Sequence, residues 1–171
     1  MRAASDGDGN AFGRLYDRYA PMVHGVLLAK VPRGQVDDLV QDVFMLAFTH
    51  LSTVREPKSF AGWLAAIARN RANDYRRRSL PEDRFADDTS DEVGASSDDP
   101  QGLAATAVLD AVKSLPPAYR ETLILRLVEG MTGPEIAART GMTHGSVRVN
   151  LHRGMKQLRA KLSSGLPPEK R

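Results

Sequence analysis

Apolar side chains recur at spacings of three and four residues through most of the chain, which is the periodicity of amphipathic helices. The clearest stripe covers residues 36–51 and consists of Val36, Leu39, Val40, Val43, Phe44, Ala47, Phe48 and Leu51. Asp37 and Asp38 fall in the first turn of this predicted helix, where the helix dipole favours negative charge. No segment alternates apolar and polar residues as a half-buried strand does, so the pattern predicts an all-α fold.

Other helices are predicted on either side of this stripe. Phe12, Leu15, Tyr16 and Tyr19 begin an earlier helix, and Pro21 either bends it or begins the next one, which would run to about Lys30. After the stripe, Ser59 is a suitable N-cap for a further helix. The apolar positions of that helix are Phe60, Trp63, Leu64, Ile67, Ala68 and Tyr75.

The periodicity stops at residues 82–99, which carry eight acidic residues and one arginine. Few large apolar side chains occur there, and Pro81 and Pro100 bound the segment. Such a segment cannot bury enough apolar surface to offset its ordering entropy. We therefore predict a flexible acidic linker at 81–102. It would join two small helical domains, 1–80 and 103–165, with a tail at 166–171.

The second domain is also predicted to be helical. Its first helix carries Ala105, Val108, Leu109 and Val112 and ends at Pro116, and Pro117 suits the first turn of the next helix. That next helix carries Leu123, Ile124, Leu127 and Val128 and stops near Gly130. Two more helices are expected after it.

Residues 135–162 have the spacing of a helix-turn-helix. Ala137, Gly141 and Val147 supply the small residue at the helix crossing, the glycine for a positive φ in the turn, and the branched residue that holds the second helix. That second helix should begin near Thr143 and run to about Leu162. Its outer face would carry His144, Arg148, His152, Arg153 and Lys156.

Charge supports a nucleic-acid role for two segments, although the net formal charge is only +3. Residues 135–162 contain one acid, Glu135, at their start. A helix in the major groove lies between two rows of phosphates that repel carboxylates, so this stretch predicts DNA binding rather than a merely solvated basic hairpin. Residues 69–78 carry five arginines and one aspartate. These arginines can follow a phosphate backbone, while Asn70 and Asn73 offer amide edges to bases.

Several kinds of function find no support. No stretch approaches the roughly 20 apolar residues of a membrane span, and the absence of cysteine excludes disulfides and thiolate metal sites. The segment DGDGNA resembles the start of a calcium loop, but Ala11 stands where that loop requires glycine. The four histidines have no metal-ligand spacing, and no nucleophile motif or phosphate loop occurs. We expect a cytoplasmic protein without membrane insertion, cofactor, metal or catalytic activity.

The chain resembles the extracytoplasmic-function sigma factors, the small two-domain branch of the bacterial sigma-70 family. Four segments in order carry the resemblance: AFGRLYDRYAPMVHGVLL, VDDLVQDVFMLAF, SFAGWLAAIARNRANDYRRR, and the run from LPPAYRETL to HRGMKQLR. Val149, Asn150, Gly154 and Met155 depart from the family pattern, so two potential phosphate cations are missing. The N-terminus is shorter than expected for the family.

The resemblance implies a partner for each surface. Core RNA polymerase would bind the helix of 36–51 through Asp38, Gln41, Asp42 and Met45. Promoter DNA would be opened and read at its −10 element by Ser59, Phe60, Asn70, Asn73, Arg76, Arg77 and Arg78. The −35 element would be read by His144, Arg148, His152, Arg153 and Lys156. An anti-sigma factor is a further partner known in the family.

Two other functions fit part of the sequence. A conventional helix-turn-helix regulator, with a sensor or dimerisation domain, would bind duplex DNA without a sigma role. It would have no need of the arginine- and asparagine-rich helix at 69–78. A helical adaptor that binds only proteins would leave both basic segments unexplained.

Overall fold

The computed structural model describes residues 2–5, 7–54, 56–79 and 100–165. Within these ranges the regular structure is helical, with no strand, which confirms the all-α prediction. The α-helices are α1 (Arg2–Ser5), α2 (Gly9–Leu28), α3 (Val36–His50), α4 (Phe60–Ser79), α5 (Pro100–Lys113), α6 (Pro117–Leu127), α7 (Gly133–Thr140) and α8 (His144–Gly165). Short 3-10 turns precede α3 and α4 at Arg33–Gln35 and Pro57–Ser59, and another follows α3 at Leu51–Thr53.

Helices α2, α3 and α4 pack against one another and bury the predicted stripes. Phe48 is the exception in the stripe of 36–51, because it stays half exposed while its ring edge meets Phe12 at 4.9 Å. Pro21 lies inside α2, so this is one helix rather than two. The Asp8 carboxylate accepts hydrogen bonds from the backbone N–H groups of Asn10 and Ala11, at 2.9 and 3.0 Å. The DGDGNA segment therefore caps a helix.

The predicted linker at 81–102 needs one correction. Residues 81–99 lie outside the described residues, but residues 100–102 form the first turn of α5. The helix begins earlier than predicted because a proline is well tolerated in a first helical turn, where its missing N–H has no acceptor to lose. Pro117 occupies the same kind of position in α6, as expected.

In the second domain, α8 lies across α6 and α7. Leu123 on α6 and Leu158 on α8 are buried. Gly154 permits the close approach, since a Cβ there would lie 2.9 Å from Leu123 Cδ1 and 3.1 Å from Tyr119 Cβ. This glycine, a departure from the family pattern, therefore has a packing reason.

The helix-turn-helix forms as predicted from α7 and α8. Ala137 and Val147 are buried between the helices. Gly141 ends α7 with φ of 75°, a left-handed conformation that side chains with a Cβ rarely adopt. The Thr143 hydroxyl accepts the Ser146 N–H at 3.1 Å, which makes Thr143 the N-cap of α8.

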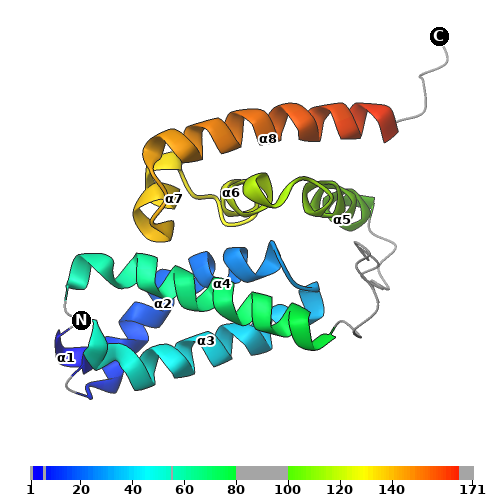
Figure 1. Cartoon of the computed structure of the whole chain (residues 1–171). Helices are drawn as coiled ribbons and strands as arrows, with labels where there is room; N and C mark the ends of the chain where they lie inside the picture. The colour runs from blue at the N-terminus through cyan, green and yellow to red at the C-terminus, as the bar shows by residue number, and fades with distance from the viewer. Residues whose placement is uncertain (1, 6, 55, 80–99, 166–171) are drawn as a thin grey trace, which may run out of the picture.

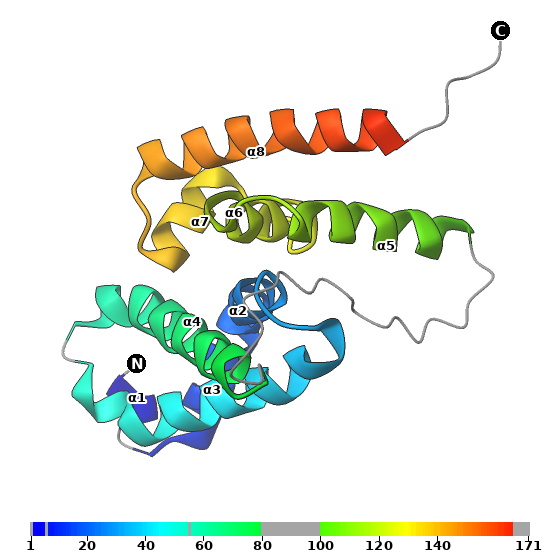
Figure 2. The same cartoon turned by 45° about the vertical axis from the view of Figure 1, so that its right-hand side comes forward.

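The two domains pack face to face. Helix α6 lies against α2, and α7 lies against α4, while α8 covers the side of α6 and α7 that faces away from the first domain (Figures 1 and 2). None of the helices among the described residues is both long and apolar enough to cross a bilayer.

Candidate functional site

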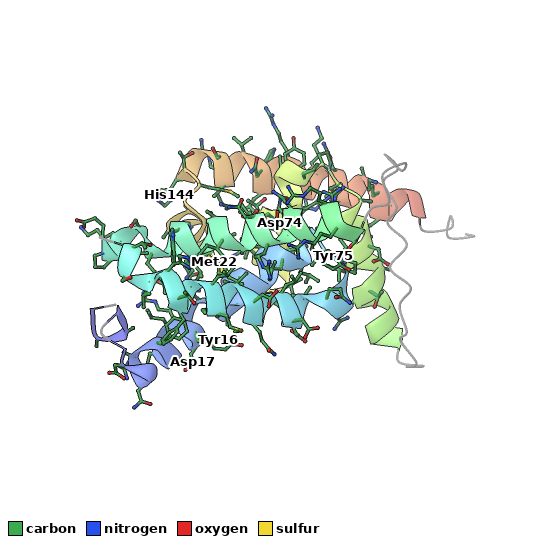
Figure 3. All side chains as sticks on the ribbon, turned by 60° about the horizontal axis from the view of Figure 1, so that its bottom comes forward. Tyr16, Asp17, Met22, Asp74, Tyr75 and His144 are labelled. Atoms are coloured by element: carbon green, nitrogen blue, oxygen red, sulfur yellow. The ribbon has the colours of Figure 1, made fainter. Side chains whose placement is uncertain are left out.

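Helix α8 presents a cationic face to solvent. His144, its first residue, is labelled in Figure 3. The five residues predicted for this face are all exposed: His144, Arg148, His152, Arg153 and Lys156. Val147, Gly154 and Leu158 face the opposite side and are buried, so helical geometry separates packing residues from cations. The face is therefore free to meet a phosphate backbone.

Arg159 extends this face, although the sequence analysis did not predict it as part of the face. It lines a shallow depression on α8 together with Leu151, His152, Met155 and Lys156. The signal was available, because Arg159 follows Lys156 by three residues and His152 by seven, which places all three on one side of a helix. It adds a cation near the end of the stretch without acids.

The one acid of residues 135–162 has a structural task. Glu135 forms a capping box with Thr132: its carboxylate accepts the Thr132 N–H at 2.8 Å, and its own N–H donates to the Thr132 hydroxyl at 3.4 Å. The hydrogen bond from the Thr132 backbone, followed by that from its side chain, lowers the pKa of Glu135. The carboxylate sits at the start of α7 and not on the face of α8.

The C-terminal half of α4 forms a second polar surface, marked in Figure 3 by Asp74 and Tyr75. Five of the residues predicted to contact the −10 element are exposed there: Asn70, Asn73, Arg76, Arg77 and Arg78. Arg77 is paired with Asp74 at 3.0 Å, and Asn73 Oδ1 accepts a hydrogen bond from Lys30 Nζ at 3.5 Å. Burial lowers the pKa of Lys30.

The other two arginines of this segment were also predicted to follow a phosphate backbone, but they are half-buried. Arg69 binds Glu121 of the second domain, with Nη2 and Oε1 2.7 Å apart. Arg71 forms an ion pair with Asp42 on α3. Of the five arginines, only Arg76, Arg77 and Arg78 remain exposed, because the other two are held between helices.

Ser59 and Phe60, which the resemblance assigns to the −10 element, lie where the turn at Pro57–Ser59 meets α4. Phe60 is 1% exposed and packs against the rings of Tyr19 and Trp63, so it is a core residue and cannot stack on a base without opening the core. Ser59 is exposed and directly precedes α4, but its hydroxyl donates to the Glu56 carbonyl at 2.7 Å. The sequence could not separate a ring in the core from a ring in a pocket, because both need an aromatic at this position.

Helix α3 presents a mixed acidic and apolar surface. Asp38 and Gln41 are exposed, and Met45 is 70% exposed, which is unusual for so apolar a side chain. Tyr16 and Phe48 are also exposed in part, next to the buried ring of Phe44 and to Phe12 respectively. These two aromatics were not predicted for the surface, since their periodicity placed them in the core.

Two family models match the chain, one in each of its two helical domains. The model of Sigma-70 region 2 matches residues 15–80, and that of Sigma-70, region 4 matches residues 105–158. RNA polymerase sigma factor CarQ of Myxococcus xanthus is 35% identical over 162 residues, which is 93% of each chain. The chain belongs to the extracytoplasmic-function sigma factors. A sigma factor of this kind binds core RNA polymerase and promoter DNA and directs promoter-specific initiation.

Other relatives agree with this membership. RNA polymerase sigma factor CnrH of Cupriavidus metallidurans is 32% identical over 179 residues, covering 94% of this sigma factor and 91% of CnrH. The solved structure of CnrH in complex with the cytosolic domain of CnrY matches 96% of each chain with a TM-score of 0.68 and 26% identity. The sigma factor RpoE of Bartonella quintana, solved with the anti-sigma factor NepR, shares the fold at a TM-score of 0.58 and 19% identity.

Proposed function

We propose that this sigma factor binds core polymerase, the −10 element and the −35 element through three separate surfaces. Asp38, Gln41 and Met45 on α3 contact core polymerase. Asn70, Asn73 and Arg76–Arg78 on α4 receive the −10 element, with Ser59 at its edge. The −35 element is read by His144, Arg148, His152, Arg153, Lys156 and Arg159 on α8.

One observation carries this proposal. The exposed amides and arginines of α4 lie in the domain that does not hold the helix-turn-helix. A regulator that binds only duplex DNA needs a single reading helix in each subunit. A protein that parts the strands also needs a surface that receives unstacked bases by hydrogen bonds and tracks their backbone with cations. Helix α4 has both kinds of group, which favours the sigma role over the conventional regulator.

Asp42 contributes less than its neighbours on α3 to the proposed polymerase contact. Its carboxylate is already paired with Arg71, so only its remaining exposed oxygen surface can meet a partner. We assign it mainly to holding α3 against α4. Met45 and the neighbouring rings of Tyr16 and Phe48 supply apolar area that a polymerase contact can bury.

The protein itself supplies binding and no bond-making chemistry in this proposal, and it works in the cytoplasm without a cofactor. A protein inhibitor is also proposed. The support is that CnrH and the Bartonella sigma factor, which share this fold, were solved with CnrY and NepR.

Reconstituted transcription tests the proposal. The unmodified protein with core polymerase should give run-off transcripts from its promoter, and permanganate should modify unpaired thymines near the −10 element. Asn70→Ala should lower this reactivity, because each lost base contact costs about 1–3 kcal/mol. Asn10→Ala is the matched control, since Asn10 is an exposed asparagine at the start of α2. If the unmodified protein never opens DNA, the sigma role fails. If Asn70→Ala opens DNA as well as Asn10→Ala does, only the assignment of α4 fails.

A further inference from the structure

The contact between the two domains contains a buried charge pair. Arg69 on α4 donates from Nη2 to Glu121 Oε1 at 2.7 Å and from Nε to Oε2 at 3.2 Å. The same Nη2 donates to the Thr140 carbonyl at the end of α7, at 3.1 Å. The Glu121 side chain is only 8% exposed. A carboxylate buried this far requires a cation, and its cation comes from the other domain.

A second charge pair lies at the other end of α6. His24 Nδ1 on α2 is 2.6 Å from Glu129 Oε1. Weaker polar contacts also join the domains: Lys113 Nζ donates to the Val31 carbonyl at 3.4 Å. These charged and polar contacts can be exchanged for contacts with water, so opening the interface costs less than opening a wholly apolar contact of the same size.

A glycine lets the domains approach this closely. A Cβ at Gly25 would lie 2.7 Å from Leu125 Cδ2 and 2.9 Å from Glu129 Cγ. All the atoms that it would meet belong to the second domain. A side chain at position 25 would therefore push the domains apart while leaving the packing within each domain unchanged.

The packed arrangement does not fit a promoter. Helix α4 packs on α7, and α7 packs on α8, so two helix layers of 8–10 Å separate the two DNA-reading helices by about 20 Å. The −10 and −35 elements are centred about 25 base pairs apart, or about 85 Å of B-form DNA. The domains must separate before both helices reach their elements. Arg69 lies on the −10-reading helix, and its charge is paired with Glu121 as long as the two domains stay together.

We propose that the domain contact is an autoinhibitory latch, formed by Arg69–Glu121, His24–Glu129 and the close approach at Gly25, which competes with engagement of polymerase and promoter. This proposal rests on the proposed function, since it concerns the regulation of the same two DNA-reading surfaces. Binding to core polymerase then requires the open form, so the apparent affinity equals the affinity of the open form multiplied by the open fraction. Variants that open the latch should gain affinity without any new contact.

Fluorescence transfer in the full chain measures the opening directly. The chain contains no cysteine, so dyes can be attached at Ser52→Cys in the first domain and Ser163→Cys on α8, both at exposed positions. Gly25→Ala is the opening variant. Gly13→Ala is its matched control on the same helix, because a Cβ at Gly13 would meet nothing within 4 Å. Glu121→Gln, which removes the charge that holds Arg69, opens the latch by an independent route.

The expected result is lower transfer efficiency in Gly25→Ala and Glu121→Gln, with core polymerase bound at least about threefold more tightly. Gly13→Ala should match the unmodified protein in both measurements. The latch is overturned if the unmodified protein is already open, if neither variant lowers the transfer, or if both open without a gain in affinity. A lack of transcripts from the unmodified protein would count against the proposed function alone, since the transfer measurement needs no polymerase.

Discussion

Asp42 on α3 and Arg71 on α4 form an ion pair that joins the helix proposed to bind polymerase to the helix proposed to receive the −10 element. The Arg71 Nε is buried and has no hydrogen-bond partner among the described residues, so the contact of its Nη2 with Asp42 is what links this side chain to α3. Asp38, one turn earlier on α3, is exposed. Two acids four residues apart on one helix therefore have different surroundings, and we propose different roles for them.

Charge reversal should separate these roles. Asp38→Lys should weaken core polymerase binding with no change in the free energy of unfolding. Asp42→Lys should also lower that free energy, by about 1 kcal/mol, because it removes the partner of Arg71. Polymerase affinity and urea unfolding are the two measurements, and Asp110→Lys, at an exposed position on α5, is the control. Core affinity unaltered by Asp38→Lys would remove α3 as the polymerase surface.

The cationic face of α8 should give DNA binding a steep dependence on salt. Each phosphate contact contributes about 0.9 to the log–log slope of affinity against salt concentration. Arg148→Ala, Arg153→Ala and Lys156→Ala, tested one at a time in the full chain on a short duplex, should each reduce the slope by about 1. Arg14→Ala, at an exposed position on α2, should leave it unchanged. A slope that stays constant in all three variants would mean that this face does not meet the backbone.

Gly154→Ala should destabilise the protein although alanine favours helices. The gain in helix propensity is about 1 kcal/mol, but the added Cβ would lie within 3.2 Å of Leu123 and Tyr119 atoms. Overpacking of this kind costs about 1–3 kcal/mol, so the net effect should lower the urea midpoint. Gly145→Ala is the control on the same helix, since its nearest neighbour atom would be 4.0 Å away. It should be neutral or stabilising, and an equal response of both variants would show that the α6–α8 contact is not tight.

The stability of the closed form, relative to the open form, should depend on pH. The hydrogen bond that His24 makes to the Glu129 carboxylate raises the pKa of His24 above 6.5, and burial lowers it by less. The negative charges of Glu129 and Asp37 also raise this pKa, while the positive charge of Arg33 lowers it. A raised pKa means that the stabilisation is complete below about pH 6.5 and is lost as pH rises through the higher value of the closed form. Transfer efficiency between the dyes should therefore fall from pH 6 towards pH 8. Glu129→Gln should remove this dependence, and an unchanged profile in that variant would assign it to another group.

Local patterns were enough to predict α3, α4, α6 and the helix-turn-helix. Gly141 and Thr143 act within a few residues of their own positions, so their roles in the turn and at the N-cap follow from backbone chemistry alone. The same holds for the cationic face of α8, because helical periodicity decides which residues share a side. Family resemblance then supplied a partner for each face.

Tertiary structure decided what each side chain does with its charge or ring. Arg69, Arg71 and Arg76 look alike in the sequence, but the first binds the second domain, the second binds α3 and the third is exposed. Phe60 and Phe48 both fit an apolar stripe, and only Phe60 is enclosed on all sides. The physical reason is that burial and ion pairing depend on which helices meet. Glu121 and Arg69 are 52 residues apart, and only packing of the two domains brings them into contact.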